Sequence, residues 1–318
     1  MLRLSVQSPF HLEATVRVLQ RRAVSRIDRW IDNRYLRVVK ANDRDVLVAV
    51  ENLGTIDAPD VRCSFDRDLN ESDRTVVARA IGRILGLDRD PHALLRVARE
   101  ISAFEEIALA LRGMRPPRFA SLFEAFARVI PFQQLSLDAG VSIVTKLVER
   151  FGANRVHEGE TYFAFPEVQV VAKARIDSLR RCGLSARKAQ TLRDLARVIE
   201  SGELQECELE SMSTPDALRR LIELPGIGRW SASVVLLRGL GRLDVFPPGD
   251  VGAARGLRGV MGLDPDTDID PIVERFGHQR GYLYFHVLGG SLLKKGLIHP
   301  APPISARSLS TNESSALQ

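Results

Sequence analysis

Two short stretches near the C-terminal end of the chain hold residues that could do chemistry together. The first, LPGIGRW, joins two helix-forming segments through a turn that contains Gly226 and Gly228. The amides that open the second helix have no partner inside it, so such a turn can bind one anion, and phosphate is the obvious candidate. The second stretch, VFPPGD, ends at Asp250. A carboxylate fixed beside a bound phosphate could stabilise a developing positive charge or orient an attacking water.

The chain between the two stretches is long enough to bring Asp250 back to the turn. A helix of about ten residues is roughly 15 Å long, and the segment LGRLDVFPPG could span about 30 Å when extended. Asp250 also precedes VGAARGLRG at the place of an N-cap, where the helix dipole favours an ionised carboxylate. The alternatives are that the glycine turn merely connects two helices and that Asp250 is only a cap.

The first 88 residues predict a small α+β domain with an antiparallel sheet. Four segments alternate apolar and polar residues in the manner of strands: LRLSVQ, YLRVVKA (35–41), DVLVAVE (45–51) and DVRCSFD (60–66). The middle pair, separated by NDR, indicates a hairpin. Two helices are expected as well, FHLEATVRVLQR and TVVARAIGRILG, with Ser72 or Asp73 as the cap of the second.

Residues 89–298 have an almost wholly helical pattern. The clearest helices are RFASLFEAFARVI (118–130), SLDAGVSIVTKLVERFG and ARKAQTLRDLARVIESG (186–202). Thr214 is the expected cap of the helix that leads into the glycine turn, with Pro215 in its first turn. The Pro/Ser-rich tail, residues 299–318, is predicted to be disordered. The expected fold class is therefore mainly α, a helical domain preceded by a small α+β domain.

The composition of the chain indicates which binding partners and which cellular compartment to expect. The 318 residues carry a net charge of +5, and 39 of the 45 basic residues are Arg. Arg suits phosphate because its guanidinium is a planar fork, although a compositional habit of the genome would give the same excess. Three scattered cysteines fit neither a disulfide framework nor a four-cysteine cluster, so a cytoplasmic protein is expected. The apolar runs are shorter than the roughly 18 residues of a membrane span.

The glycine turn, with an Asp following it by this spacing, resembles the helix-hairpin-helix (HhH-GPD) DNA glycosylase superfamily, and most of all its 3-methyladenine DNA glycosylase II branch. Three other features agree with this resemblance. FARVIPFQQLSLDAG is similar to the helix-loop-helix that carries the DNA-penetrating wedge of the family, and CGLSARKAQTLRDLARVI is similar to the helix before its hairpin. The N-terminal α+β unit resembles the small sheet domain of this branch.

The resemblance implies a role for each matching residue. Asp250 would be the catalytic carboxylate, and Trp230 stands where strand-cleaving members carry a Schiff-base Lys, which implies a monofunctional enzyme that uses water. Gln134 would be the wedge. The implied base pocket comprises Trp230, Tyr282, Tyr284 and Phe132; the implied DNA contacts are Gln133, Gln134, Leu135, Pro225, Gly226, Ile227, Gly228 and Arg229. Other pocket aromatics of the family are replaced by Val234, Leu288 and Gly289.

The resemblance further implies that no cofactor is required, although a monovalent cation could bind the backbone carbonyls of Leu224 and Ile227. The expected partner is double-stranded DNA that contains a damaged base, most simply an alkylated purine, and the protein is expected to act as a nucleoid-associated monomer. Two other functions stay open: a glycosylase for oxidised or deaminated bases, and a non-catalytic protein that uses the hairpin only to hold DNA.

Overall fold

The N-terminal part of the chain forms a five-stranded antiparallel sheet. The computed structural model describes residues 1–303, and its sheet has the order β1-β5-β4-β3-β2. The strands are β1 (Leu2–Leu4), β2 (Arg29–Ile31), β3 (Arg34–Ala41), β4 (Arg44–Asn52) and β5 (Val61–Phe65). The predicted hairpin is β3–β4, which turns at Asn42 in a left-handed conformation with φ 51°. In β4 the β-branched residues Val46, Val48 and Val50 alternate along the strand, and such side chains pack well on a pleated surface.

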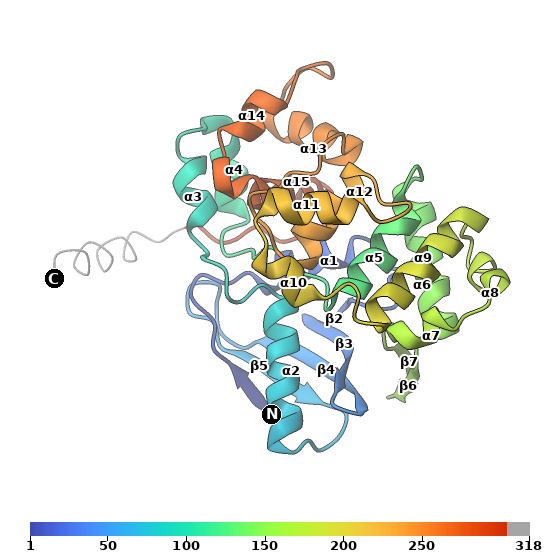
Figure 1. Cartoon of the computed structure of the whole chain (residues 1–318). Helices are drawn as coiled ribbons and strands as arrows, with labels where there is room; N and C mark the ends of the chain where they lie inside the picture. Colours follow the sequence, from blue (N-terminus) through green and yellow to red (C-terminus); the bar gives the residue numbers. More distant parts are fainter. Residues whose placement is uncertain (304–318) are drawn as a thin grey trace.

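Two helices accompany the sheet, α1 (Leu12–Gln20) and α2 (Glu71–Ile84). Helix α2 lies across one face of the sheet (Figure 1). The predicted cap of α2 is wrong, because Asn70 is the N-cap and its side chain accepts a hydrogen bond from the Asp73 amide at 2.8 Å. Ser72 and Asp73, the predicted caps, fall instead in the first turn, where the negative charge of Asp73 complements the helix dipole.

The rest of the described chain is mainly helical, in agreement with the expected fold class. The first helices are α3 (Ala93–Ala98), α4 (Ser102–Ala110), α5 (Leu122–Val129), α6 (Leu137–Phe151), α7 (Val168–Ala172), α8 (Ile176–Arg180) and α9 (Ala186–Glu200). They are followed by α10 (Glu206–Ser211), α11 (Thr214–Ile222), α12 (Arg229–Val234), α13 (Val251–Met261), α14 (Asp270–Glu274) and α15 (Arg280–Leu293). Short 3-10 turns at Ile130–Phe132 and Gly277–Gln279 and a π-helical turn at Val235–Gly239 complete the set.

Helix boundaries differ from the predicted ones by a few residues. Helix α5 begins after Ser121, whose side chain caps it, so Phe119 precedes the helix and donates its amide to the Arg238 carbonyl at 2.7 Å. Helix α11 is capped by Ser213, one residue before the predicted Thr214. In both cases a serine with extended backbone offers its hydroxyl to the third amide of the helix, which is the favoured N-cap geometry.

A β-hairpin interrupts the segment that was predicted to be almost wholly helical. Strands β6 (Asn154–His157) and β7 (Glu160–Phe163) pair antiparallel around Glu158 and Gly159, which both have positive φ. Two left-handed residues at the tip of a two-residue turn suit the twist of a hairpin, and Gly supplies one of them without strain. Tyr162 on β7 packs against the apolar side chains of Leu36 and Leu47 on the main sheet.

One contiguous hydrophobic core runs from the sheet into the helical part. Helix α15, which is buried along most of its length, packs against α1 of the N-terminal part. The predicted domain boundary at residue 88 stays a prediction. Of the predicted disordered tail, residues 304–318 lie outside the described residues. The preceding segment packs against the fold, with the Ala301 amide donating to Ala110 and Arg112 donating to the Pro302 carbonyl.

Candidate functional site

The LPGIG turn is a compact hairpin between α11 and α12. Gly226 has φ 82° and lies against α9, where an added Cβ would sit 2.5 Å from Thr191 Oγ1. Only glycine meets both demands, the left-handed backbone and the close approach. Gly228 is the N-cap of α12, and an added Cβ there would meet open space. In the hairpin, the half-buried Gly226 therefore faces the protein, whereas Gly228 is exposed to solvent.

Asp250 is held at the junction of two helices, and both of its carboxylate oxygens are engaged. As the N-cap of α13, it accepts a hydrogen bond from the Ala253 amide at Oδ1 over 2.9 Å. Its Oδ2 accepts a hydrogen bond from Trp230 Nε1 over 3.1 Å. Trp230 is the second residue of α12, so the chain does return Asp250 to the hairpin. The carboxylate is half-buried and fixed in orientation, as a preorganised charge must be.

A cavity of about 210 Å³ lies beside this carboxylate. Among the predicted pocket residues, Trp230, Tyr284 and Phe132 line it together with Asp250. Burial raises the pKa of the Tyr284 hydroxyl, and the negative charge of Asp250 raises it further. The Phe132 ring packs on Gly140, where a Cβ would meet the ring at 2.4 Å. The cavity thus combines one carboxylate with aromatic faces, the chemistry needed to hold a planar base.

Tyr282 does not belong to this cavity, which corrects its predicted role. Its hydroxyl donates to the Asp90 carbonyl at 2.7 Å, and the side chain is buried away from the pocket. Residues two apart on a helix point in nearly opposite directions, so α15 turns Tyr284 to the cavity and Tyr282 away from it. Of the positions where family aromatics were missing, Val234 lines the cavity, whereas a Cβ at Gly289 would contact Leu111.

The predicted wedge loop follows the 3-10 turn before α6. Gln133 does not point into solvent: its side-chain amide donates to the Gly226 carbonyl at 3.0 Å and to Ser231 Oγ at 2.9 Å. Gln134 is exposed at the tip and has φ 56°, an unusual conformation for a residue with a side chain. Leu135 is 45% exposed and lines the cavity edge. The loop therefore presents Gln134 and Leu135 outward while Gln133 fastens it to the hairpin.

A groove of about 670 Å³ joins the loop, the hairpin and the start of α13. Asp250 and Trp230 line both the groove and the cavity, so the carboxylate lies where the two meet. Of the predicted DNA contacts, the groove is lined by Gln133, Gln134, Leu135, Gly226 and Gly228. Pro225 and Arg229 are exposed beside it, and Ile227 is buried. Arg187 and Lys188 at the start of α9 add positive charge to its wall.

Lys188 shapes the wedge loop from the opposite wall. Its ammonium donates to the Pro131 carbonyl at 3.3 Å and to the Gln133 carbonyl. Burial lowers the pKa of Lys188. The predicted cation ligands on the hairpin, Leu224 and Ile227, are linked to each other, because the Ile227 amide donates to the Leu224 carbonyl at 3.1 Å. Residues 1–303 contain no cluster of three or more His, Cys, Asp or Glu side chains suited to a metal ion.

Sequence reasoning missed the arginines of the cavity. Arg21, Arg26, Arg128 and Arg238 all line it. Arg21 follows α1 and its guanidinium lies 5.9 Å from the centre of the Phe132 ring. Arg238 belongs to the π-helical turn, is 2% exposed, and stacks on Phe119 at 4.9 Å. No local signal distinguishes these arginines from the many others of the chain, because their positions depend on contacts between distant segments.

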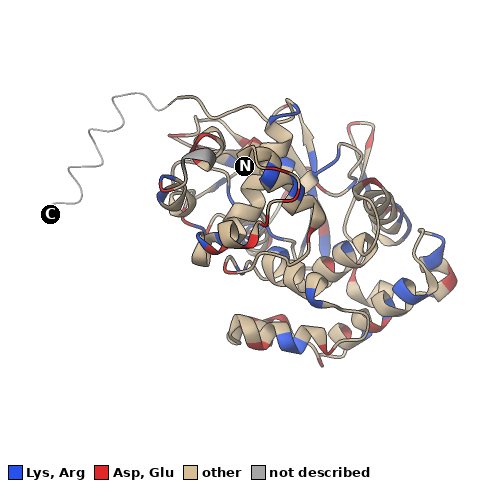
Figure 2. Ribbon diagram, turned by 90° about the horizontal axis from the view of Figure 1, so that it is seen from above, with Lys and Arg blue, Asp and Glu red and all other residues tan. Residues whose placement is uncertain are grey.

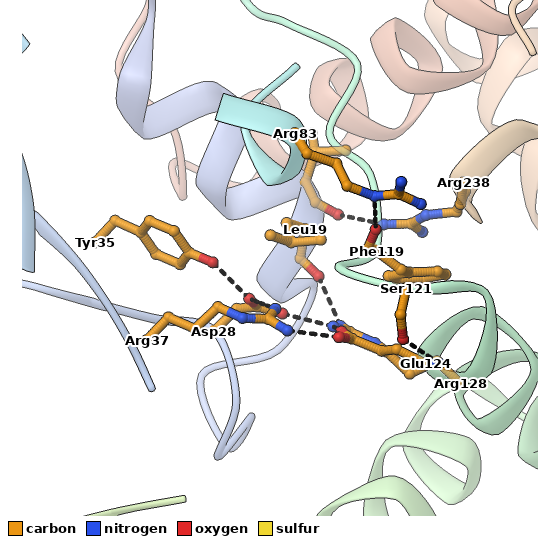
Figure 3. A network of polar contacts seen from close by, with 11 residues as sticks. Leu19, Asp28, Tyr35, Arg37, Arg83, Phe119, Ser121, Glu124, Arg128 and Arg238 are labelled. Atoms are coloured by element: carbon orange, nitrogen blue, oxygen red, sulfur yellow. Dashed lines mark hydrogen bonds and ion pairs between the residues drawn. The ribbon is translucent and has the colours of Figure 1, made fainter. Parts of the chain in front are cut away.

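A buried network of charges lies behind the cavity and joins the sheet to α5 (Figure 3). Asp28 accepts hydrogen bonds from Tyr35 at 2.8 Å, from Arg37 at 2.7 Å and from Arg128 at 2.7 Å. Glu124 accepts from Arg37 at 2.6 Å and from Arg128 at 3.0 Å. Two carboxylates thus balance two guanidiniums. Elsewhere the positive and negative residues are interspersed along the helices, so net charge alone does not mark one face (Figure 2).

Within residues 1–303 we find no helix with both the length and the apolar character needed to cross a membrane.

The chain is similar to known proteins of DNA repair along most of its length. The family model of HhH-GPD superfamily base excision DNA repair proteins matches residues 127–276, and that of the AlkA N-terminal domain matches residues 1–121. DNA-3-methyladenine glycosylase 2 of Escherichia coli (strain K12) is 26% identical over 295 residues, which cover 90% of this chain and 96% of the relative. A putative DNA-3-methyladenine glycosylase of Bacillus subtilis (strain 168) is 29% identical over 274 residues, covering 84% and 90%.

The fold is shared with solved structures as well. The 3-methyladenine DNA-glycosylase from Archaeoglobus fulgidus superposes with a TM-score of 0.76 at 25% identity, covering 91% of this chain and 97% of that one. An 8-oxoguanine glycosylase/lyase of Clostridium acetobutylicum, solved with double-stranded DNA, shares the fold with a TM-score of 0.69 at 19% identity. These comparisons confirm the resemblance inferred from the hairpin, and the chain belongs to the HhH-GPD superfamily of base excision DNA repair proteins, with an AlkA-type N-terminal domain.

Proposed function

We propose that this protein is a monofunctional DNA glycosylase of base excision repair, which hydrolyses the N-glycosidic bond of a flipped-out alkylated base. The observation that carries the proposal is the place of Asp250, at the meeting point of an aromatic cavity and a groove formed by the hairpin. The relatives named as DNA-3-methyladenine glycosylases support an alkylated base as the substrate.

The mechanism follows from the charge that base excision creates. Breaking the bond between C1′ and the base nitrogen builds positive charge on the sugar, and a negative group fixed nearby stabilises it. Asp250 is such a group, because Trp230 and the Ala253 amide hold its two oxygens. The same carboxylate can orient the water that attacks C1′. Position 230 carries Trp rather than Lys, so no Schiff base forms there and an abasic site is left.

DNA binding would use the groove on either side of the carboxylate. A duplex hides the glycosidic bond, so the damaged nucleotide must leave the helix and enter the cavity. Gln134, exposed at the loop tip, would occupy the gap with Leu135 beside it. The exposed backbone at Gly228 would receive a phosphate of the damaged strand, with or without a monovalent cation on the hairpin carbonyls. One chain carries the whole site, which suits a monomer on double-stranded DNA.

An Asp250→Asn substitution tests the proposal. Asn remains a good N-cap, so α13 keeps its start while the charge disappears. A charge about 4 Å from C1′ is worth about 4 kcal/mol at an effective dielectric constant of about 20, or on the order of 1,000-fold in rate. We expect single-turnover excision from methylated duplex DNA to fall by that factor while binding to an abasic-site analogue is kept.

Asp264→Asn, an exposed residue beyond the other end of α13, is the matched control and should excise at the wild-type rate. If the Asp250→Asn variant excised the base at the wild-type rate, Asp250 would not be the catalytic carboxylate. Failure of the wild-type protein to form abasic sites on any lesion of a panel would leave only a DNA-binding role.

A further inference from the structure

Lys188 lines the groove beside the hairpin but has no part in the mechanism above. It lies in the first turn of α9, and its ammonium donates to the Pro131 carbonyl at 3.3 Å and to the Gln133 carbonyl. Within residues 1–303 no carboxylate forms an ion pair with it, and burial lowers its pKa. A partly buried ammonium needs hydrogen-bond acceptors, and here two main-chain oxygens at the start of the wedge loop supply them.

The bond to the Gln133 carbonyl bears directly on Gln134. That carbonyl belongs to the peptide group that joins the two residues, so the orientation of this peptide plane sets φ of Gln134. Gln134 has φ 56°, in the left-handed region that a residue with a side chain seldom adopts. Such a conformation persists only where the surrounding structure enforces it. The hydrogen bond from Lys188 fixes the peptide plane and thereby holds the exposed tip of the loop in its unusual conformation.

Helix α9 contacts the hairpin through the same face. Thr191 lies one turn after Lys188, and an added Cβ at Gly226 would sit 2.5 Å from Thr191 Oγ1. The side-chain amide of Gln133 closes the arrangement, because it donates to the Gly226 carbonyl at 3.0 Å. Helix α9, the wedge loop and the hairpin are therefore connected in pairs, and the distance between the loop tip and the phosphate-binding turn is fixed.

We propose that Lys188 is a positioning residue, which holds Gln134 in the conformation that enters the gap left by a flipped nucleotide. This inference rests on the proposed function, because a duplex has such a gap only when a nucleotide leaves it. Strain at one left-handed residue corresponds to a change in population on the order of 10-fold. Without Lys188 the tip would adopt this conformation in about a tenth of the molecules, and affinity for a gapped duplex would fall by the same factor.

Attraction of the phosphate backbone is the competing role for the same side chain, and Arg187 separates the two. Arg187 is exposed on the same turn of α9 and lines the same groove, and among residues 1–303 it makes no hydrogen bond to the wedge loop. Arg187→Met removes one positive charge, whereas Lys188→Met removes one positive charge and two hydrogen bonds to the loop. The start of α9 is kept in both variants, because the main-chain amide of Lys188 donates to the capping Ser185 hydroxyl.

The test measures insertion of the loop tip without any chemical step. The probe is a duplex with a tetrahydrofuran abasic analogue opposite 2-aminopurine, whose fluorescence rises when its stacking is disturbed. Affinity for this duplex and for an undamaged duplex of the same sequence is measured for the wild type, Arg187→Met and Lys188→Met at several salt concentrations. The single-turnover excision rate of 7-methylguanine from a duplex is measured alongside, and thermal melting reports whether each variant is folded.

We expect Arg187→Met to weaken binding to both duplexes by a similar factor and to reduce the salt slope by about one. Lys188→Met should show the same loss on the undamaged duplex and a further loss of about 10-fold on the abasic duplex, with a smaller rise in fluorescence. Excision should slow by the same further factor. Glycine adopts a positive φ without strain, so in a Gln134→Gly background the further loss on adding Lys188→Met should disappear.

Equal losses on the two duplexes for Lys188→Met, or a further loss that persists in full in the Gln134→Gly background, overturn the inference. If Lys188→Met does not melt like the wild type, Lys188→Gln, whose side chain is one bond shorter, is judged by the same criteria. If the wild type excises no lesion, the proposed function falls and fluorescence alone decides whether Lys188 positions the tip. A wild type that binds the abasic duplex no more tightly than the undamaged one overturns both.

Discussion

Replacing Asp28 by Asn should destabilise the protein strongly, although Asp28 is far from the hairpin in sequence. The Asp28 carboxylate is fully buried and accepts hydrogen bonds from Tyr35, Arg37 and Arg128. Asn can accept at one oxygen only, and its NH₂ group would face donors. The substitution also leaves two guanidiniums opposite the single charge of Glu124. Removing one partner from a buried ion pair typically costs about 3–5 kcal/mol, and we expect a loss in this range.

Lowering the pH should remove the contribution of the Asp28 carboxylate to the stability of the wild-type protein. Burial alone would raise the pKa of Asp28, but Arg37 and Arg128 outweigh it and lower the pKa from 3.8 to about 2. A group whose pKa is depressed in the folded state adds stability above its unfolded pKa. That contribution is lost as the pH falls through the folded value. Nearly two pH units correspond to about 2 kcal/mol, which should disappear between about pH 4 and pH 2.

Urea unfolding followed by circular dichroism checks both statements. The wild type and Asp28→Asn are compared at pH 7 and at several values down to pH 2, with Asp266→Asn as the control because Asp266 is exposed. The difference between wild type and Asp28→Asn should shrink as the pH falls. A difference below about 1 kcal/mol at pH 7, or one that does not change with pH, would refute the reasoning, because a satisfied buried network predicts neither.

The hairpin and the wedge loop give two further matched pairs. Gly226→Ala should lower both the melting temperature and the DNA affinity, because the added Cβ would contact Thr191. Gly228→Ala adds a Cβ in open space, so it should leave the melting temperature unchanged and weaken DNA binding by about 10-fold. Gln133→Ala should lower the free energy of unfolding, measured with urea, by about 1–2 kcal/mol, because two hydrogen bonds to the hairpin are lost. Gln134→Ala should slow excision without changing the free energy of unfolding. Equal effects within either pair would contradict the assigned positions.

The features that the sequence predicts well are those determined by local chemistry. The glycines of the hairpin and the cap at Asp250 follow from backbone requirements within a few residues, and both lie where the spacing indicated. The β3–β4 hairpin likewise follows from alternation around one turn. The β6–β7 hairpin was missed because its four-residue strands are too short to outweigh the surrounding helical pattern, although Glu158–Gly159 was a turn signal.

The features that the sequence pattern did not predict depend on contacts between residues that are far apart in the chain. Tyr282 and Tyr284 look equivalent in GYLYF, and only the packing of α15 separates them. Arg128 and Arg238 are indistinguishable in composition, yet one has two carboxylates and the other has none among the described residues. Which arginine is neutralised depends on Asp28, a hundred residues earlier. The electrostatic character of the cavity is therefore a tertiary property that no short motif encodes.

Part of the cavity wall comes from the end of α1 and the segment that follows it, through Gln20, Arg21, Ser25, Arg26 and Ile27. The N-terminal part of the chain, which contains the sheet, thus contributes to the cavity and does not function independently of the helical part. A chimera that kept this helical half and borrowed a sheet from another relative would leave Glu124 facing an unmatched surface and would open the pocket on one side. The two parts of the chain therefore have to be exchanged or engineered together. A change in the charge of a buried residue in one part requires a compensating change in the other.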